Sequence, residues 1–367
     1  MSAHERPPTL PALTSLRFFA ALWVVLFHLA LPALQLLPVV GRRVVQEGWL
    51  GVPFFFVLSG FILVHVYGPA VRGAGLDRRA FWWARLARVY PMYLGALAIA
   101  FPLFLMTDRQ PPALGIAETV ATPLLLQSWL PSLSVAWNHP AWSLSTEAFF
   151  YAVFPVAAVL LVRAAAKVRP LWLALGSLAA GLAIQALLAD LPTDTVLLRN
   201  LTQVFPPWWL PFFLYGAALG LVRHEMQQAG RRVAPAWGLA VLAVAVACLA
   251  AQPSPLPRTA AIVVAEGAFG LAILGLSWPG AGTGWLAWRP LVELGEASYA
   301  LYLIHIPLAA WGSLLLGRSL SQPAARTPLE FLALCAALVG ASLALHRWFE
   351  RPARRWLLRL RGGTAHR

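Results

Sequence analysis

Residues 17 to 28 read Arg17-Phe-Phe-Ala-Ala-Leu-Trp-Val-Val-Leu-Phe-His28, an apolar helical run with an ionisable residue at each end. Ionisable groups inside the hydrocarbon zone of a membrane are energetically costly and usually functional. The spacing turns a helix by about 1,100° and advances it by about 16 Å, so both residues project from nearly the same face. We therefore expect one face of a membrane helix to carry Arg17 near the surface and His28, a proton-transfer group, deep inside.

The composition is that of an integral membrane protein, because 60% of the residues are hydrophobic and only 11% are charged. Apolar stretches long enough to cross a bilayer recur along the whole chain, and one further candidate lies at 113–130. The expected spans are approximately 14–36, 48–68, 90–107, 144–163, 171–190, 207–222, 235–251, 259–279, 297–316 and 328–347.

The placement of lysine and arginine decides whether 113–130 also crosses. Without that crossing, and with a cytoplasmic N-terminus, most basic clusters face the cytoplasm, as the positive-inside rule requires. A crossing at 113–130 would move the later basic clusters to the outside. We therefore expect this segment, which carries Glu118 and Pro123, to be only partly inserted.

The predicted fold is thus an all-α, polytopic helical bundle of about ten transmembrane helices in the cytoplasmic (inner) membrane, with both termini cytoplasmic. Residues 1–367 form a single membrane domain, in which 348–367 make a basic cytoplasmic tail. Positive-inside anchoring in the lipid bilayer explains the formal net charge of +14 better than nucleic-acid binding does, since no nucleic-acid motif accompanies the arginines.

The run Gly48-Trp-Leu-Gly-Val-Pro-Phe-Phe-Phe-Val-Leu-Ser-Gly-Phe-Ile-Leu63 places glycines, Pro53 and Ser59 inside an apolar span. Small residues allow membrane helices to approach closely, so a packing seam is the favoured interpretation. Pro53 could instead loosen the start of the helix and leave backbone groups free for a polar ligand.

The basic stretch 77–91 puts Arg78, Arg85 and Arg88 close to one helical face. Two interpretations need the same charges. The stretch can anchor an amphipathic helix to anionic lipid heads, or its guanidinium groups can clamp the phosphates of a nucleotide-bearing cofactor.

In the stretch 137–147, Glu147 lies about one turn inside a span, where it must find a partner or be protonated. A functional role is the favoured interpretation for Glu147. His139 is expected at the outer interface, where it could meet an acceptor, although a loop histidine is more often incidental.

Two C-terminal stretches also carry ionisable residues. Residues 298–307 place His305 inside a span, with Tyr299 and Tyr302 as possible hydrogen-bond partners. Residues 346–355 close the last span, where we expect Glu350 to pair with neighbouring arginines and the cluster to act mainly as an anchor.

Taken in order, these segments resemble the acyltransferase family 3 membrane proteins over nearly the full chain. The resemblance is carried by Arg17 with His28 and by GWLGVPFFFVLSGF, RLARVYP, WSLSTEAFFY, SYALYLIHIP and WFERP. It implies an O-acyltransferase that moves an acyl group, often acetyl, from acyl-CoA to a hydroxyl of an extracytoplasmic or lipid-linked carbohydrate or a small molecule. Cell-envelope polysaccharides and glycolipids are among the acceptors that fit.

Residue by residue, the arginine-to-histidine pair of the family falls on Arg17 and His28, its paired arginines on Arg85 and Arg88, and its glutamate on Glu147. Family members often carry a second acidic or amide residue after that glutamate, whereas this chain has Ala148. Some relatives add a C-terminal hydrolase-like domain for the acceptor. This chain ends without one, so we expect the membrane domain, or a separate partner, to position the acceptor.

The expected mechanism places the phosphates of acyl-CoA, typically acetyl-CoA, on Arg85 and Arg88, with the pantetheine arm passing Arg17 toward His28. Burial disfavours the charged form of a histidine, so a neutral His28 would act as general base. Glu147 would orient His28 or hold the acceptor, and no metal is expected. Alternatively, His28 could act as a nucleophile that carries the acyl group.

A rival interpretation is a multi-pass transporter or flippase in which His28, Glu147 and His305 form a proton relay. It is less favoured, because the sequence shows no inverted repeat and no paired broken helices.

The charge distribution predicts the topology. Reporter fusions after residue 167 and after residue 363 should both report a cytoplasmic location, because the positive-inside rule keeps the basic clusters there. A periplasmic signal from either fusion would overturn the predicted number of spans.

Overall fold

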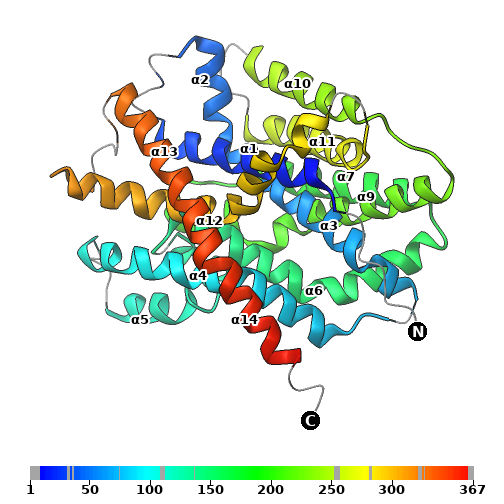
Figure 1. Ribbon diagram of the computed structural model, residues 1–367, viewed down its shortest axis with the longest axis horizontal. Coiled ribbons are helices and arrows are strands. Elements are labelled where there is room, and N and C mark those ends of the chain that lie inside the picture. The colour runs from blue at the N-terminus through cyan, green and yellow to red at the C-terminus, as the bar shows by residue number, and fades with distance from the viewer. Residues whose placement is uncertain are drawn as a thin grey trace.

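The computed structural model describes residues 9–30, 34, 37–73, 75–107, 112–135, 137–251, 257–280, 283–320, 325 and 327–362. Within these ranges the chain is helical and contains no strand (Figure 1). The end of the first predicted span, beyond residue 30, and residues 363–367 of the predicted tail lie largely or wholly outside the described residues.

Within the described part of the chain, nine helical segments are long and apolar enough to cross a membrane. Their principal helices are α1 (Pro11–Leu29), α3 (Gly51–Arg72), α4 (Arg78–Thr107), α6 (Trp142–Ala165), α7 (Pro170–Ala189), α9 (Leu210–Gln228), α11 (Arg258–Leu276), α12 (Arg289–Leu315) and α13 (Pro328–Leu345). A further apolar helix, α10 (Pro235–Ala251), has 17 residues, at the short end of what spans a bilayer. Each predicted span thus coincides with one helix, and the predicted polytopic all-α bundle is confirmed.

Shorter helices lie between these spans: α2 (Val39–Gln46), α5 (Pro112–Ala121) and α8 (Val196–Val204). The segment predicted to be partly inserted begins with α5, which has only 10 residues and is followed by turns and short 3-10 helices. The Tyr93 hydroxyl donates to the Thr122 carbonyl at 2.5 Å, and the Tyr90 hydroxyl donates to the Pro123 carbonyl at 2.8 Å. These bonds hold the segment against α4 as a folded insertion that is too short to cross.

The predicted C-terminal tail begins as helix. A π-helical turn, His346–Glu350, links α13 directly to α14 (Arg351–Gly362). The indole N–H of Trp83 donates to the Leu357 carbonyl at 2.9 Å, and Arg361 forms an ion pair with Asp77 at 2.9 Å. The basic segment is therefore docked along α4 rather than trailing from the bundle.

Glycines set the distance between the most closely packed helices. A Cβ atom on Gly60 of α3 would lie 1.9 Å from the Phe213 carbonyl oxygen, and one on Gly216 of α9 would lie 1.9 Å from the Val57 carbonyl oxygen. Such contacts are possible only without side chains, so the packing-seam interpretation is confirmed for this span. Pro53 lies in the first turn of α3, where no intrahelical donor is needed, and it does not break the helix.

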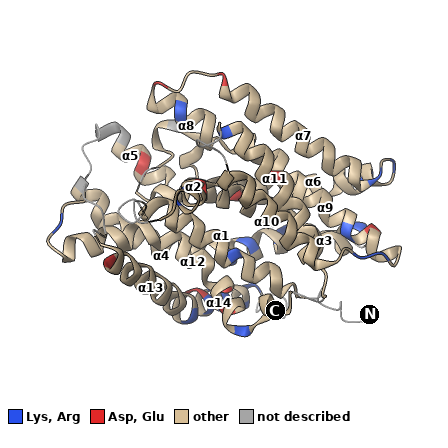
Figure 2. Ribbon diagram, turned by 90° about the horizontal axis from the view of Figure 1, so that it is seen from above, with Lys and Arg blue, Asp and Glu red and all other residues tan. Residues whose placement is uncertain are grey.

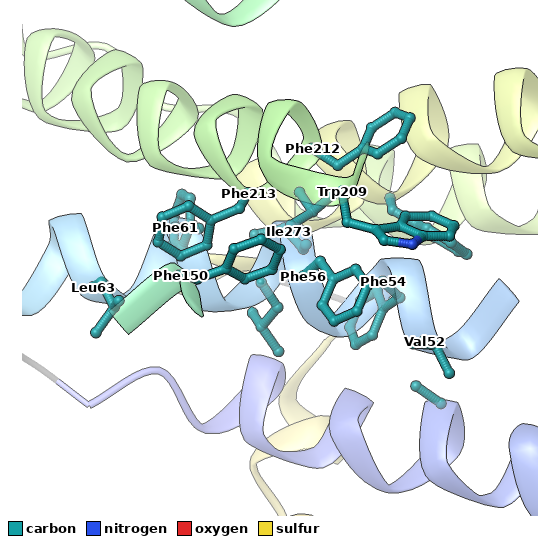
Figure 3. Close-up of a cluster of buried hydrophobic side chains, with 14 of the residues drawn as sticks. Val52, Phe54, Phe56, Phe61, Leu63, Phe150, Trp209, Phe212, Phe213 and Ile273 are labelled. Atoms are coloured by element: carbon teal, nitrogen blue, oxygen red, sulfur yellow. The ribbon is translucent and has the colours of Figure 1, made fainter. Parts of the chain in front are cut away.

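Aromatic side chains fill the interface that this close approach creates (Figure 3). Phe150 of α6 stacks on Phe213 with ring centroids 4.7 Å apart, and Phe56 meets Phe150 edge-on at 5.2 Å. Most of the ribbon carries no charged residue, and the charged residues gather mainly at helix ends and along α14 (Figure 2). The charged groups inside the described part of the bundle are therefore few.

The glycine contact predicts a sharp difference between two alanine substitutions. Gly60→Ala should lower the thermal stability of detergent-purified protein, since overpacking typically costs about 1–3 kcal/mol. Gly176→Ala in α7 is the control, because an added Cβ there meets nothing within 4 Å. Equal melting temperatures for the two variants would contradict the role of the glycine seam.

Candidate active site

A cavity of about 190 Å³ opens between α1, α3, α4, α6 and α12. It is called the arginine cavity here, and its end of the bundle the arginine end. The polar residues that line it are Arg17, Ser59, Arg85, Arg88, Ser143, Glu147, Tyr151, Ser298, Tyr299 and Tyr302. The structure therefore brings together most of the residues that the sequence marked as candidates, from five separate helices.

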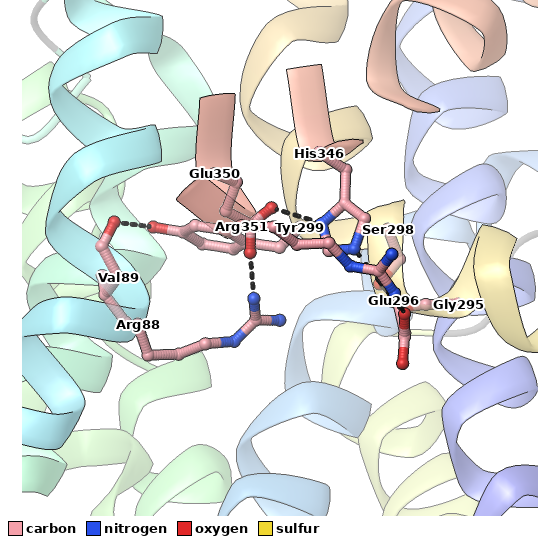
Figure 4. Close-up of polar contacts among 9 residues, drawn as sticks. All are labelled: Arg88, Val89, Gly295, Glu296, Ser298, Tyr299, His346, Glu350 and Arg351. Carbon is pink, nitrogen blue, oxygen red and sulfur yellow. Dashed lines mark hydrogen bonds and ion pairs between the residues drawn. The ribbon is translucent and has the colours of Figure 1, made fainter. Parts of the chain in front are cut away.

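Arg88 forms an ion pair with Glu350, which is only 1% exposed (Figure 4). His346 also donates from Nδ1 to Glu350, at 2.9 Å. The π-helical turn that carries His346 and Glu350 directs both side chains inward, and π-turns are often found at functional sites. The prediction that Glu350 pairs with the arginines next to it in the sequence is corrected, because this buried carboxyl group pairs with Arg88 of α4; the interpretation of the cluster as mainly an anchor does not account for it.

Arg17 and Arg85 differ from Arg88. Among the described residues, neither forms an ion pair with a carboxylate. Arg85 donates from Nη2 to the Tyr67 hydroxyl at 3.1 Å, and its buried Nε atom has no partner in the part of the chain that the structure describes. The arginine cavity thus holds two arginines that make no direct ion pair with a carboxylate in the described part of the chain, although Glu147 lines the same cavity.

Glu147 accepts a hydrogen bond from the hydroxyl of Tyr151, one helical turn further along α6. The partner expected for this carboxyl group is therefore a neutral phenol. The structure shows no hydrogen bond between Glu147 and His28 among the described contacts, so Glu147 does not orient His28 directly. Tyr151 was missed in the sequence, although its position four residues after Glu147 was a signal.

The histidines lie at the opposite end of α1, called the histidine end. His305 of α12 is fully buried, and its Nε2 lies 3.2 Å from Nδ1 of His28. His28 is partly exposed, and its ring centroid lies 5.5 Å from that of the exposed His139. Three histidines that are far apart in the sequence therefore meet here. In the described residues no group of three His, Cys, Asp or Glu side chains could hold a metal ion.

Tyr302 connects the two ends of the site. It lines the arginine cavity, and its ring centroid is 6.1 Å from that of His305, on the same helix. Its hydroxyl lies 2.7 Å from the Ser143 hydroxyl and donates to the Pro140 carbonyl at 2.9 Å. His28 itself does not line the cavity, so Tyr302 and His305 lie between the cavity and the histidine that sequence reasoning placed at the reaction centre.

A proline in α12 explains how the His139 loop is held in place. Pro307 has no backbone N–H, so the Leu303 carbonyl lacks its usual helical donor. The buried side chain of Asn138 supplies one instead, donating from Nδ2 to that carbonyl at 2.9 Å. Asn138 was not singled out in the sequence. Its hydrogen bond to α12 holds the loop that carries His139.

Comparison with known proteins identifies the family of this chain. A family model described as an acyltransferase domain matches residues 10–347. The acyltransferase MdmB of Streptomyces mycarofaciens is 31% identical over 374 aligned residues, which cover 96% of this chain and 93% of that protein. The ORF330 protein of Acidianus two-tailed virus is 28% identical over 56% of each chain.

A more distant relative is the O-acetyltransferase OatA of Staphylococcus aureus. It is 24% identical over 160 residues, which cover 41% of this chain and 25% of that protein. No solved structure matches this chain.

The ion pair between Arg88 and Glu350 predicts how single and double substitutions of these two residues change the stability of the protein. Arg88→Ala should destabilise the protein by up to roughly 3–5 kcal/mol, because it removes the cation beside a buried carboxylate and leaves Glu350 with only the hydrogen bond from His346. The double variant Arg88→Gln with Glu350→Gln should lose much less, because no charge remains unpaired. Arg85→Ala is the matched control on the same helix, since Arg85 forms no ion pair with a carboxylate among the described residues.

The melting temperature of each purified variant in detergent measures these differences. If Arg88→Ala were no less stable than Arg85→Ala, the ion pair would not stabilise the fold, and the interpretation of the segment around Glu350 as an anchor would be favoured again.

Proposed function

Because the chain belongs to acyltransferase family 3, we propose that this multi-pass membrane O-acyltransferase moves an acyl group, typically acetyl, from acyl-CoA to a hydroxyl. The proposed acceptor is an extracytoplasmic or lipid-linked carbohydrate, a glycolipid or a small molecule. The enzymatic family favours this reaction over the transporter or flippase alternative.

The observation that carries the donor proposal is the excess of arginines over carboxyl groups around the arginine cavity. Arg17, Arg85 and Arg88 line it, against Glu147 in its wall and Glu350 paired with Arg88, and neither Arg17 nor Arg85 makes a direct ion pair among the described residues. Guanidinium groups suit phosphates, because their planar donors match phosphate oxygens in pairs. A CoA thioester carries several phosphates, and these would approach Arg85 first, with Arg17 deeper along the path.

The size of the arginine cavity indicates which part of the donor enters it. Its volume of about 190 Å³ is below the roughly 300–1,000 Å³ of pockets that enclose a drug-sized ligand. We therefore propose that the nucleotide of acyl-CoA stays outside, at the arginine end, while the acylated pantetheine arm occupies the cavity. Ser59, Ser143 and Glu147 are then the polar groups beside the arm.

The proposed reaction takes place at His28. The acceptor oxygen attacks the thioester carbonyl as its proton passes to neutral His28, the C–S bond breaks, and the sulfur leaves with that proton as CoA thiol. The thioester must pass Tyr302 to reach this point, since Tyr302 lines the cavity and adjoins His305. The exposed His139 beside His28 is the residue that an acceptor arriving from the histidine end would meet.

This arrangement agrees with the proposed orientation. Both termini would be cytoplasmic and the arginine end would face the cytoplasm of the inner membrane, where acyl-CoA is soluble. The histidine end would face outward, toward cell-envelope polysaccharides or glycolipids. OatA is named an O-acetyltransferase, which supports acetyl as the group and a hydroxyl as the acceptor. A separate protein could hold a large acceptor at the histidine end.

The test uses purified protein in liposomes with radiolabelled acetyl-CoA and an extract of envelope lipids and glycans. Wild-type protein should release CoA thiol and label the acceptor fraction. His28→Gln keeps hydrogen-bonding capacity but cannot accept a proton, so kcat should fall by about 10²- to 10⁴-fold.

Arg85→Ala is the companion variant, and it should raise the KM for the donor while largely preserving kcat. Substantial turnover by well-folded His28→Gln protein would remove His28 as the base. An unchanged KM for the donor in Arg85→Ala would contradict phosphate binding by Arg85 and favour the alternative, in which Arg85 anchors the helix to lipid.

A further inference from the structure

We propose that His305 is a positioning residue that, together with the Val24 carbonyl, holds His28 in one tautomer, so that Nε2 of His28 is the atom that takes the acceptor's proton. This inference rests on the proposed function, in which His28 is the base. It follows from the hydrogen-bond partners of two ring nitrogens, one on each histidine.

The contacts of His305 show which of its ring nitrogens carries the hydrogen. Its Nδ1 lies 2.7 Å from the backbone carbonyl oxygen of Tyr302. A carbonyl oxygen only accepts hydrogen bonds, so Nδ1 of His305 must carry a hydrogen and donate it. His305 is fully buried in an apolar bundle, which favours the neutral ring. Nε2 of His305 is then a bare lone pair, able only to accept.

The contacts of His28 likewise show which of its ring nitrogens carries the hydrogen. Its Nδ1 lies 3.2 Å from Nε2 of His305 and 3.0 Å from the Val24 carbonyl oxygen. Both neighbours are acceptors, so Nδ1 of His28 carries the hydrogen that they share. In the neutral ring only one nitrogen is protonated, and Nε2 of His28 is therefore left with its lone pair free.

The two histidines differ in how exposed they are to an acceptor. His28 is partly exposed at the histidine end, whereas His305 is fully buried. The ring with the free lone pair is thus the one that an acceptor can approach. The full burial of His305 makes it a positioning residue rather than a second base.

The energetic benefit appears when His28 is protonated. The hydrogen bond from Nδ1 of His28 to neutral His305 then becomes charge-assisted, and such bonds are roughly twice as strong as neutral ones. The gain arises as the proton transfers and is absent in the resting enzyme, so it lowers the barrier instead of tightening substrate binding. The carboxylate in a Ser-His-Asp triad orients its histidine in a comparable way, although it adds a full negative charge.

Two short amides at position 305 test the proposal. His305→Gln can place an amide oxygen near the position of Nε2, where it can accept from His28. His305→Asn is one bond shorter and cannot reach. With acetyl-CoA as donor, we expect kcat to fall by about 10- to 150-fold in His305→Asn, the range for losing a hydrogen bond to a charged group.

The two controls are internal to the design. His305→Gln should stay within a few-fold of wild type, and the KM for acetyl-CoA should be unchanged in both variants, because the arginine cavity is intact. Should His305→Asn fail to fold, His305→Phe replaces it, since phenylalanine keeps a ring in the apolar interior and offers no acceptor.

The outcomes separate this inference from the proposed function. If wild-type protein transfers no acetyl group, the proposed function is overturned, and the inference falls with it. If wild-type protein is active and needs His28, but His305→Asn or His305→Phe keeps wild-type kcat, only the positioning role is overturned. Equal inactivation of the Gln and Asn variants in folded protein would also overturn it, because His305 would then react directly.

Discussion

A bundle surrounded by hydrocarbon offers its ionisable side chains no water, so each of them must find a partner inside the protein or be neutral. This constraint explains the contacts that define the site. Glu350 is held by Arg88 and His346, Glu147 by Tyr151, and His28 by His305. Arg17 and Arg85 have no carboxylate partner in the described part of the chain. These two arginines are therefore the proposed binding groups for the phosphates of the donor.

The same constraint divides the site into two ends along α1. Charge collects at the arginine end, and the neutral, proton-accepting imidazoles collect at the histidine end, about 16 Å away by helical rise. The proposed acyl-CoA donor would need both chemistries in that order, because its phosphates and its thioester lie at opposite ends of an extended molecule. Tyr302 is the residue at which the two ends meet.

Backbone contacts set the precision of this arrangement. A Cβ atom on Gly295 of α12 would lie 1.9 Å from the Thr14 carbonyl oxygen of α1, so these helices touch without an intervening side chain. That close approach at the arginine end keeps α1 and α12 side by side up to His28 and His305. A hydrogen bond between two short imidazole side chains depends on such proximity.

The sequence by itself determined the helical spans and most of the candidate site residues, because hydrophobic length and charge placement are properties of the local chain. It also placed Arg17 and His28 on one helix face. It misjudged Glu350, since nothing local distinguishes a surface anchor from a carboxylate that a π-turn directs into the bundle. Only the tertiary structure decided that Arg88 is already paired while Arg85 is not, that Glu147 makes no hydrogen bond to His28 in the described part of the chain, and that His305 accepts from His28. Those outcomes depend on which helices lie side by side, and residues 277 positions apart cannot reveal a hydrogen bond through their own periodicity.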